Sequence, residues 1–173
     1  NAIQNGINHI DVSPLYGDAE KHLGSWFKRH GKQDFFLACK TAERRKAGAW
    51  EGIKRSLDMM NVDKFDLFQM HGIDDQKTLE TALGPGGAME AILEARDQGL
   101  VDYIGITGHN PPNHNLALQR FDFDTVLFPL NRIHAVHPTG WNDYGPLLKT
   151  AKKKDVGVMA IKSVAMGTWP DGR

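Results

Sequence analysis

The sequence predicts an α/β fold with parallel strands, because short apolar segments alternate with longer amphipathic ones along all 173 residues. The alternation has a regular length. About 30 residues separate Asp11 from Lys40 and Lys40 from His71, which is the length of one strand–helix–strand unit. A unit of this length brings the chain back to the same end of the sheet, so consecutive strands are expected to run in one direction.

Apolar segments rich in β-branched or aromatic residues are predicted as buried strands. In chain order they are residues 7–12, 35–39, 65–70, 103–107, 125–128 and 156–161. Segments with apolar residues at helical spacing are predicted as helices between them, at residues 19–30, 49–60, 88–98 and 144–154. Gly31 and Gly99 follow two of these segments, where glycine commonly ends a helix.

Polar residues at the strand ends distinguish the two folds that use this alternation, the open doubly wound sheet and the closed (β/α)8 TIM barrel. Active-site residues of barrels lie at the carboxyl ends of the strands. Polar residues occur here at or just past six successive strand ends: Asp11, Lys40, His71, Thr107, Asn131 and Lys162. The Gly-x-Gly-x-x-Gly that usually follows the first strand of a dinucleotide-binding open sheet does not occur. A barrel takes about 250 residues and eight units. We therefore expect one domain over residues 1–173, an incomplete (β/α)8 TIM barrel of about six βα units.

Composition argues against several classes of partner. Lysine plus arginine total 21 and aspartate plus glutamate total 21, so no basic excess suggests a nucleic acid. No apolar run reaches the roughly 18 residues that cross a bilayer, and no signal sequence opens the chain. The single Cys39 cannot form an internal disulfide. We expect a cytoplasmic protein that acts on a small molecule, without a nucleic-acid or membrane partner.

The first three predicted strands carry residues suited to protonating a carbonyl oxygen. Tyr16, in the loop after Asp11, could donate a proton, but a tyrosine pKa of about 10 makes it a weak acid near neutrality. Lys40 on the adjacent strand is expected to favour the ionised phenol, and Asp11 to keep Lys40 charged. His71 on the next strand could donate a hydrogen bond to a developing alkoxide. Together these residues predict a site for acid catalysis.

The same residues lie in motifs that resemble the aldo-keto reductase family over essentially the whole chain. Residues 6–17, Gly-Ile-Asn-His-Ile-Asp-Val-Ser-Pro-Leu-Tyr-Gly, are similar to that family's Asp-x-x-x-x-Tyr-Gly signature. Lys40 and His71 match the other two positions of its catalytic tetrad, after Asp11 and Tyr16. The resemblance implies an oxidoreductase that transfers a hydride from a nicotinamide cofactor, NADP(H) rather than NAD(H), to an aldehyde or ketone, with Tyr16 as general acid.

Positions that hold the cofactor match the family less closely. Thr107-Gly108 stands where a Ser-Asn pair commonly binds the nicotinamide carboxamide, so the hydroxyl is kept and the amide is lost. Lys162-Ser163 stands where Ser-Pro is common, although lysine also occurs at the first of these two positions. The resemblance implies that Asp11 and these four residues contact the cofactor, and that no metal is needed.

Three other functions use some of the same residues. A barrel hydrolase could place a metal among His9, Asp11, His71 and His109. That function leaves Tyr16 and Lys40 without a role. Lys162 could instead be the Schiff-base nucleophile of an aldolase-like barrel. The family also includes regulatory subunits that bind nucleotide with little turnover.

The sequence also predicts the locations of several further residues. Cys39 precedes the inward-facing Lys40, so strand alternation turns it outward into packing under the helices. Histidines in polar segments are expected to face solvent: His114, His134 and His137. The loop residues Trp141 and Trp169 are expected to line a substrate entrance. The chain lacks a starting methionine and stops in a loop, so we expect an internal fragment, aggregation-prone and inactive by itself because two strand edges stay unpaired.

Overall fold

The computed structural model describes residues 3–32, 34–140 and 142–164 and divides into two compact units. The first unit comprises Asn1–His71 and Glu80–Ile104, and the second comprises Gly72–Leu79 and Gly105–Arg173. Each unit has its own candidate cluster of polar residues. None of the described helices is both long and apolar enough to cross a membrane.

The strands follow each other in the sheet in the same order as in the chain, β1-β2-β3-β4-β5-β6. They are β1 (His9–Asp11), β2 (Phe36–Thr41), β3 (Phe65–Met70), β4 (Val101–Thr107), β5 (Thr125–Pro129) and β6 (Gly157–Ile161). The pairs β1–β2, β2–β3, β4–β5 and β5–β6 are parallel. A doubly wound sheet would reverse its strand order at a switch point. Sequential order is that of a (β/α)8 barrel, so the predicted fold class is confirmed.

Helices occupy the connections between the strands. They are α1 (Ala19–His30), α2 (Lys46–Met60), α3 (Gln76–Leu83), α4 (Ala88–Asp97), α5 (Pro111–Arg120), α6 (Arg132–Val136) and α7 (Gly145–Lys154), with a short 3-10 turn at Ile3–Asn5. Both α1 and β3 have the predicted bounds, and the other predicted elements differ by a few residues at their ends.

Three helices were not predicted from the sequence: α3, α5 and α6. α5 begins with Pro111 and Pro112, and proline is well tolerated in the first turn of a helix. The Asn110 side chain caps this helix by accepting a hydrogen bond from the Asn113 backbone N–H at 3.2 Å. Asn131 caps α6 in the same way through His134. The two asparagines therefore marked helix starts that the apolar pattern did not reveal.

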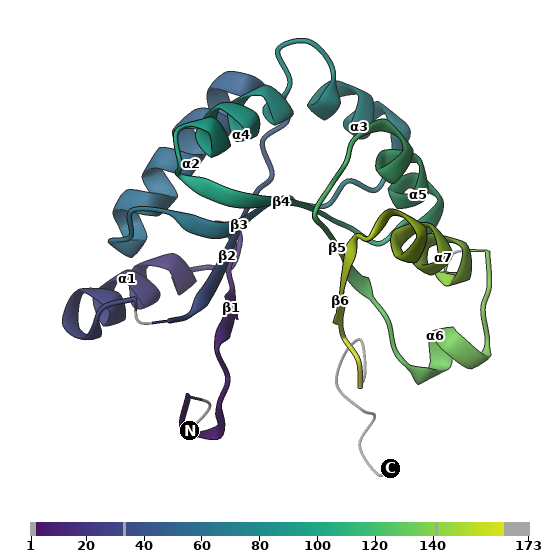
Figure 1. Cartoon of the computed structure of the whole chain (residues 1–173), viewed down its shortest axis with the longest axis horizontal. Coiled ribbons are helices and arrows are strands. Elements are labelled where there is room, and N and C mark those ends of the chain that lie inside the picture. Colours follow the sequence, from purple (N-terminus) through teal and green to yellow (C-terminus); the bar gives the residue numbers. More distant parts are fainter. Residues whose placement is uncertain (1–2, 33, 141, 165–173) are drawn as a thin grey trace. The chain divides into compact units, whose positions relative to one another are not determined.

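In the first unit, α1, α2 and α4 lie on one side of β1, β2 and β3 (Figure 1). α2 packs against both α1 and α4. Gly24 of α1 allows the close approach to α2, because a Cβ there would overlap the Met59 carbonyl oxygen. Cys39 is fully buried, and its thiol donates to Glu20 of α1 at 3.7 Å. Burial raises the pKa of Cys39 to about 12, which confirms the predicted packing role.

In the second unit, α5 and α7 pack together beside β5 and β6 (Figure 1). The prediction that His114 faces solvent is wrong, because it lies on the buried face of α5 with Ala117 and Leu118. His137 is exposed, as predicted, whereas His134 is half-buried beside Tyr144. The proposed entrance residues Trp141 and Trp169 lie outside the described residues.

Candidate active site

The strand register of the first unit brings the predicted catalytic residues to one face. Asp11 pairs with Ala38, two residues before Lys40, and Lys40 pairs with Gln69, two residues before His71. Residues two apart on a strand project to the same side. Asp11, Lys40, Gln69 and His71 therefore share one face at the carboxyl ends of β1, β2 and β3.

Lys40 is held there as a buried cation. Its side chain is 1% exposed, and its ammonium donates to Asp11 Oδ2 in an ion pair. The other carboxylate oxygen of Asp11 accepts from Gln69 Nε2 at 2.8 Å. Both oxygens of Asp11 are thus used by donors that fix its orientation. A charge can be kept in a protein interior when it is paired with an opposite charge and its partner is also hydrogen-bonded. The Lys40 ammonium and the Asp11 carboxylate meet both requirements.

Tyr16 lies in the loop after β1 with its ring against two other site residues. Its centroid is 5.2 Å from Lys40 Nζ and 5.8 Å from the centroid of the His71 ring, which it meets edge-on. Both distances fall in the range of favourable cation–π and aromatic contacts. The ring is 46% exposed, so the loop leaves the phenol accessible to solvent.

The pKa of Tyr16 is raised, which corrects the expectation that Lys40 would favour its ionised form. Partial burial is the larger cause, and the negative charge of Asp11 adds to it. Because Asp11 pairs with Lys40, the charge of the ammonium is compensated near the phenol. Tyr16 is therefore protonated at neutral pH, the state that a proton donor needs before it reacts.

His71 is positioned through its ring and its backbone. Ser13 Oγ lies 3.1 Å from His71 Nδ1, and the guanidinium of Arg44 donates to the His71 carbonyl oxygen at 2.6 Å. The His71 backbone N–H donates to the Thr41 carbonyl at the end of β2. These contacts place the ring beside Tyr16 on the shared face.

Two residues of this site were missed by the sequence reasoning. Ser13 is 1% exposed and Gln69 is fully buried, so neither is a surface residue. Each lies two positions from a tetrad member, Ser13 after Asp11 and Gln69 before His71. Strand alternation could have placed Gln69 on the catalytic face, whereas Ser13 lies past the end of β1 and had no such signal.

A cavity of about 610 Å³ adjoins Lys40 in the first unit. Its walls come from Pro14 and Leu15 after β1, from the end of β2 and from the first half of α2. The small residues Gly48 and Gly52 of α2 help to keep it open. Lys40 is the member of the predicted tetrad among its lining residues, which do not include Tyr16 or His71.

In the second unit, Thr107 and Gly108 have structural roles. Thr107 is buried, and its hydroxyl accepts from the Gly72 backbone N–H at 3.3 Å. A Cβ on Gly108 would overlap the Asp74 carboxylate and lie 2.6 Å from His114 Nε2. The space of a larger side chain at position 108 is therefore filled by Asp74 and His114, which explains why the amide of the family pattern is missing. Cofactor contact by Thr107 and Gly108 stays a prediction.

Lys162 belongs to a second polar cluster, with His109 and Asp74. Lys162 Nζ donates to His109 Nε2 at 3.0 Å, and His109 Nδ1 lies 3.4 Å from Asp74 Oδ2. Asp74 also accepts from the backbone N–H of His109 and Asn110. The imidazole thus bridges a cation and an anion. Lys162 is half-buried, and the following Ser163 is exposed; their contact with the cofactor stays a prediction.

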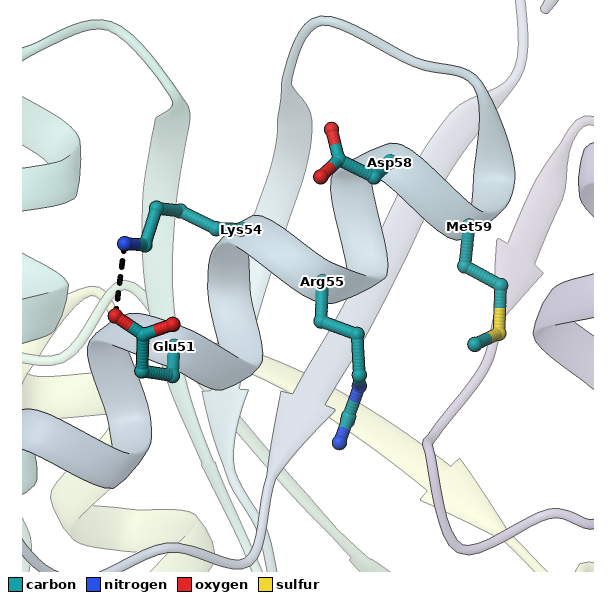
Figure 2. A pocket seen from close by; sticks show the side chains of 5 residues that line it. All are labelled: Glu51, Lys54, Arg55, Asp58 and Met59. Carbon is teal, nitrogen blue, oxygen red and sulfur yellow. Dashed lines mark hydrogen bonds and ion pairs between the residues drawn. The ribbon is translucent and has the colours of Figure 1, made fainter.

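No group of three or more histidine, cysteine or acidic side chains within the described ranges is arranged to hold a metal ion. A further hollow lies along α2 (Figure 2). There Lys54 pairs with Glu51 at 2.8 Å, while Arg55 extends away from that pair. The five residues that line this hollow include no predicted site residue.

Comparison with known proteins gives a family-model match, Aldo/keto reductase family, over residues 1–172. Aldo-keto reductase str7 of Strobilurus tenacellus is 29% identical over 94% of this chain and 48% of its own length. Aldo-keto reductase YhdN of Bacillus subtilis is 28% identical over 76% of this chain and 40% of its own length. The chain thus spans about half the length of the curated relatives that it matches.

Solved structures give the same result for the fold. Aldo-keto reductase AKR11C1 of Bacillus halodurans, in its holo form, matches 99% of this chain and 59% of its own chain with a TM-score of 0.73 and 26% identity. A Pseudomonas aeruginosa structure described as an aldo-keto reductase matches 96% of this chain and 65% of its own, with a TM-score of 0.78 and 20% identity. With a family model matched over almost its whole length, the chain belongs to the aldo/keto reductase family.

Proposed function

We propose that the protein containing this chain is an oxidoreductase that transfers a hydride from a nicotinamide cofactor to an aldehyde or ketone, with Tyr16 as general acid. The observation that carries the proposal is the contact set of the first unit. Tyr16 lies against both Lys40 and His71, and Asp11 pairs with Lys40. The contacts bring together a phenol, a buried ammonium and an imidazole. Such a combination can protonate and stabilise a carbonyl oxygen.

The donor set fits a nicotinamide cofactor because it supplies protons and hydrogen bonds but has no group that could deliver a hydride. When bound, the reduced cofactor supplies that hydride to the carbonyl carbon and is oxidised. The half-buried Lys162 and the exposed Ser163 are the residues of the second unit that we propose to contact it. We further propose NADPH as the preferred donor, which the family resemblance supports, and a cytoplasmic location.

The residues of the first unit would act in sequence on the carbonyl oxygen. Tyr16 gives its hydroxyl proton to that oxygen as negative charge develops there. Lys40 lies beside the ring as the phenolate forms, and Asp11 with Gln69 holds Lys40 in place. His71 donates a hydrogen bond that orients the oxygen. Because the Tyr16 ring is 46% exposed, the phenolate can regain a proton from water.

The test is carbonyl-dependent oxidation of NADPH and NADH by the full-length protein, over a panel of aldehydes and ketones, with Tyr16→Phe alongside. Loss of a general acid is expected to lower kcat by roughly 10²- to 10⁴-fold. Cofactor affinity, measured by fluorescence titration, should stay within about twofold, since the change removes only a hydroxyl that donates to the substrate. Equal turnover by both proteins would contradict the role of Tyr16.

The regulatory function remains the second candidate, because the family includes nucleotide-binding members. It predicts tight binding of NADPH with no turnover of any carbonyl in the panel. Absence of both binding and turnover would overturn the assignment of a cofactor site.

A further inference from the structure

We propose that Ser13 is a positioning residue that holds the His71 ring in the tautomer with its proton on Nε2. The proposed reductase function gives this arrangement its catalytic meaning, whereas the tautomer itself depends only on the hydrogen bonds around Ser13. A neutral imidazole carries one proton on one of two nitrogens, so the partner of Nδ1 decides what Nε2 can do.

The hydrogen-bond inventory of the Ser13 side chain indicates the direction of its bond to His71. Its hydroxyl oxygen accepts from the Leu15 backbone N–H at 3.2 Å. The hydroxyl has one proton to donate, and His71 Nδ1, at 3.1 Å, is its acceptor within the described part of the chain. Ser13 is 1% exposed, so water cannot easily replace that acceptor.

The opposite assignment leaves a buried donor without a partner. If Nδ1 carried the proton, Ser13 Oγ would accept from both Leu15 and His71, and its own hydrogen would have no acceptor among the described residues. An unsatisfied buried donor is costly, more so than the gain from a typical neutral hydrogen bond. The Ser13 hydroxyl therefore donates, Nδ1 accepts, and the ring proton lies on Nε2.

Ser13 also links His71 to the loop that carries Tyr16. The Ser13 carbonyl accepts from the Tyr16 backbone N–H at 2.9 Å, while its hydroxyl accepts from Leu15. One residue thus shapes the turn that presents the phenol and contacts the imidazole that acts with it. With its proton on Nε2, His71 has on that nitrogen the N–H that hydrogen bonding to a carbonyl oxygen requires, as Tyr16 has in its hydroxyl.

The direct test is the ¹⁵N NMR spectrum of the histidine rings in the full-length protein without cofactor, with His71 assigned through His71→Asn. We expect a pyridine-type shift at Nδ1 and a pyrrole-type shift at Nε2. In Ser13→Ala the form protonated on Nδ1 should become populated, and in Ser13→Thr, which keeps a hydroxyl, the Nε2–H form should return. A wild-type ring protonated on Nδ1, or an Ala variant with the wild-type tautomer, overturns the proposal.

Kinetics supply the second readout. Ser13→Ala is expected to lower kcat by about tenfold, the factor of one neutral hydrogen bond, with little change in cofactor affinity. Ser56→Ala is the matched control, because Ser56 is also fully buried but lies on α2. The control should keep wild-type kcat, and Ser13→Thr should recover most of the loss. An Ala variant with wild-type kcat overturns the positioning role, whereas no turnover by wild type with the expected tautomer contradicts only the proposed function.

Discussion

Both units place charged residues at or just past the ends of their strands, but the two units differ in how deeply these residues are buried. In the first unit Lys40 is 1% exposed, and its carboxylate partner is held by a second donor from the fully buried Gln69. In the second unit the side chains of His109 and Asp74 are 52% and 43% exposed. Electrostatic interactions in a water-excluded site are stronger and cost less reorganisation. The difference shows that candidate site residues can be recognised by their position at a strand end. A preorganised site also requires that their hydrogen-bond and ion-pair partners are buried.

We expect the largest effect on stability when the Asp11–Lys40 ion pair of the first unit is broken. Asp11→Asn leaves the Lys40 ammonium buried without a counter-charge, so the free energy of unfolding should fall by about 3 kcal/mol. The matched control is Asp102→Asn, which breaks the exposed pair with Lys64 at 2.7 Å. Exposed pairs contribute little to stability because water and salt screen them, so the control should lose much less. Urea unfolding of the full-length protein at neutral pH measures both, and equal losses would contradict the distinction between the pairs.

A second prediction concerns pH and the buried His114 of the second unit. Burial, partly opposed by Asp74, lowers the pKa of His114 to about 4 from its ordinary 6.5. Between these values the unfolded chain binds a proton that the folded ring does not, so stability falls as the pH drops from about 6.5 to about 4. The loss at the acid end of this window is about 3 kcal/mol.

Chemical unfolding at several pH values across that window measures the slope. His114→Leu removes the titrating group and should flatten the dependence, whereas His137→Gln, at an exposed position, should keep the wild-type slope. A steep slope that survives in His114→Leu would show that other groups cause the acid sensitivity.

The smallest expected effect concerns the space beside Gly108. Gly108→Ala pushes a methyl group into the Asp74 carboxylate and the His114 ring, which should cost about 2 kcal/mol in the free energy of unfolding. Gly52→Ala in α2 meets its nearest atom, Thr41 Oγ1, at 3.9 Å. Alanine is favoured over glycine inside a helix, so this control should gain up to about 1 kcal/mol. Thermal unfolding distinguishes the two, and a stabilising Gly108→Ala would refute the packing explanation.

Sequence reasoning succeeded where the local pattern was strong. The amphipathic repeat of α1 and the apolar segment of β3 gave the observed bounds, and Cys39 packs under a helix as strand alternation predicted. It failed for α5, where the segment around His114 was expected to be a polar loop and the cap at Asn110 was overlooked. That error also misplaced His114, since a residue assigned to a loop is expected to be exposed.

The sequence by itself determined the alternation of strands and helices, the barrel class and the four candidate catalytic residues. These follow from period, spacing and motif, all of which are local along the chain. Only the tertiary structure decided which side chains hold these four catalytic candidates in position. Gln69 meets Asp11, and Ser13 meets His71, each across 58 residues. Such pairs depend on strand register and on how loops return to the strand ends, and alternation alone fixes only the face on which a residue lies. The direction of the Tyr16 pKa shift was decided in the same way, because burial and the neighbouring Asp11 exist only in the folded chain.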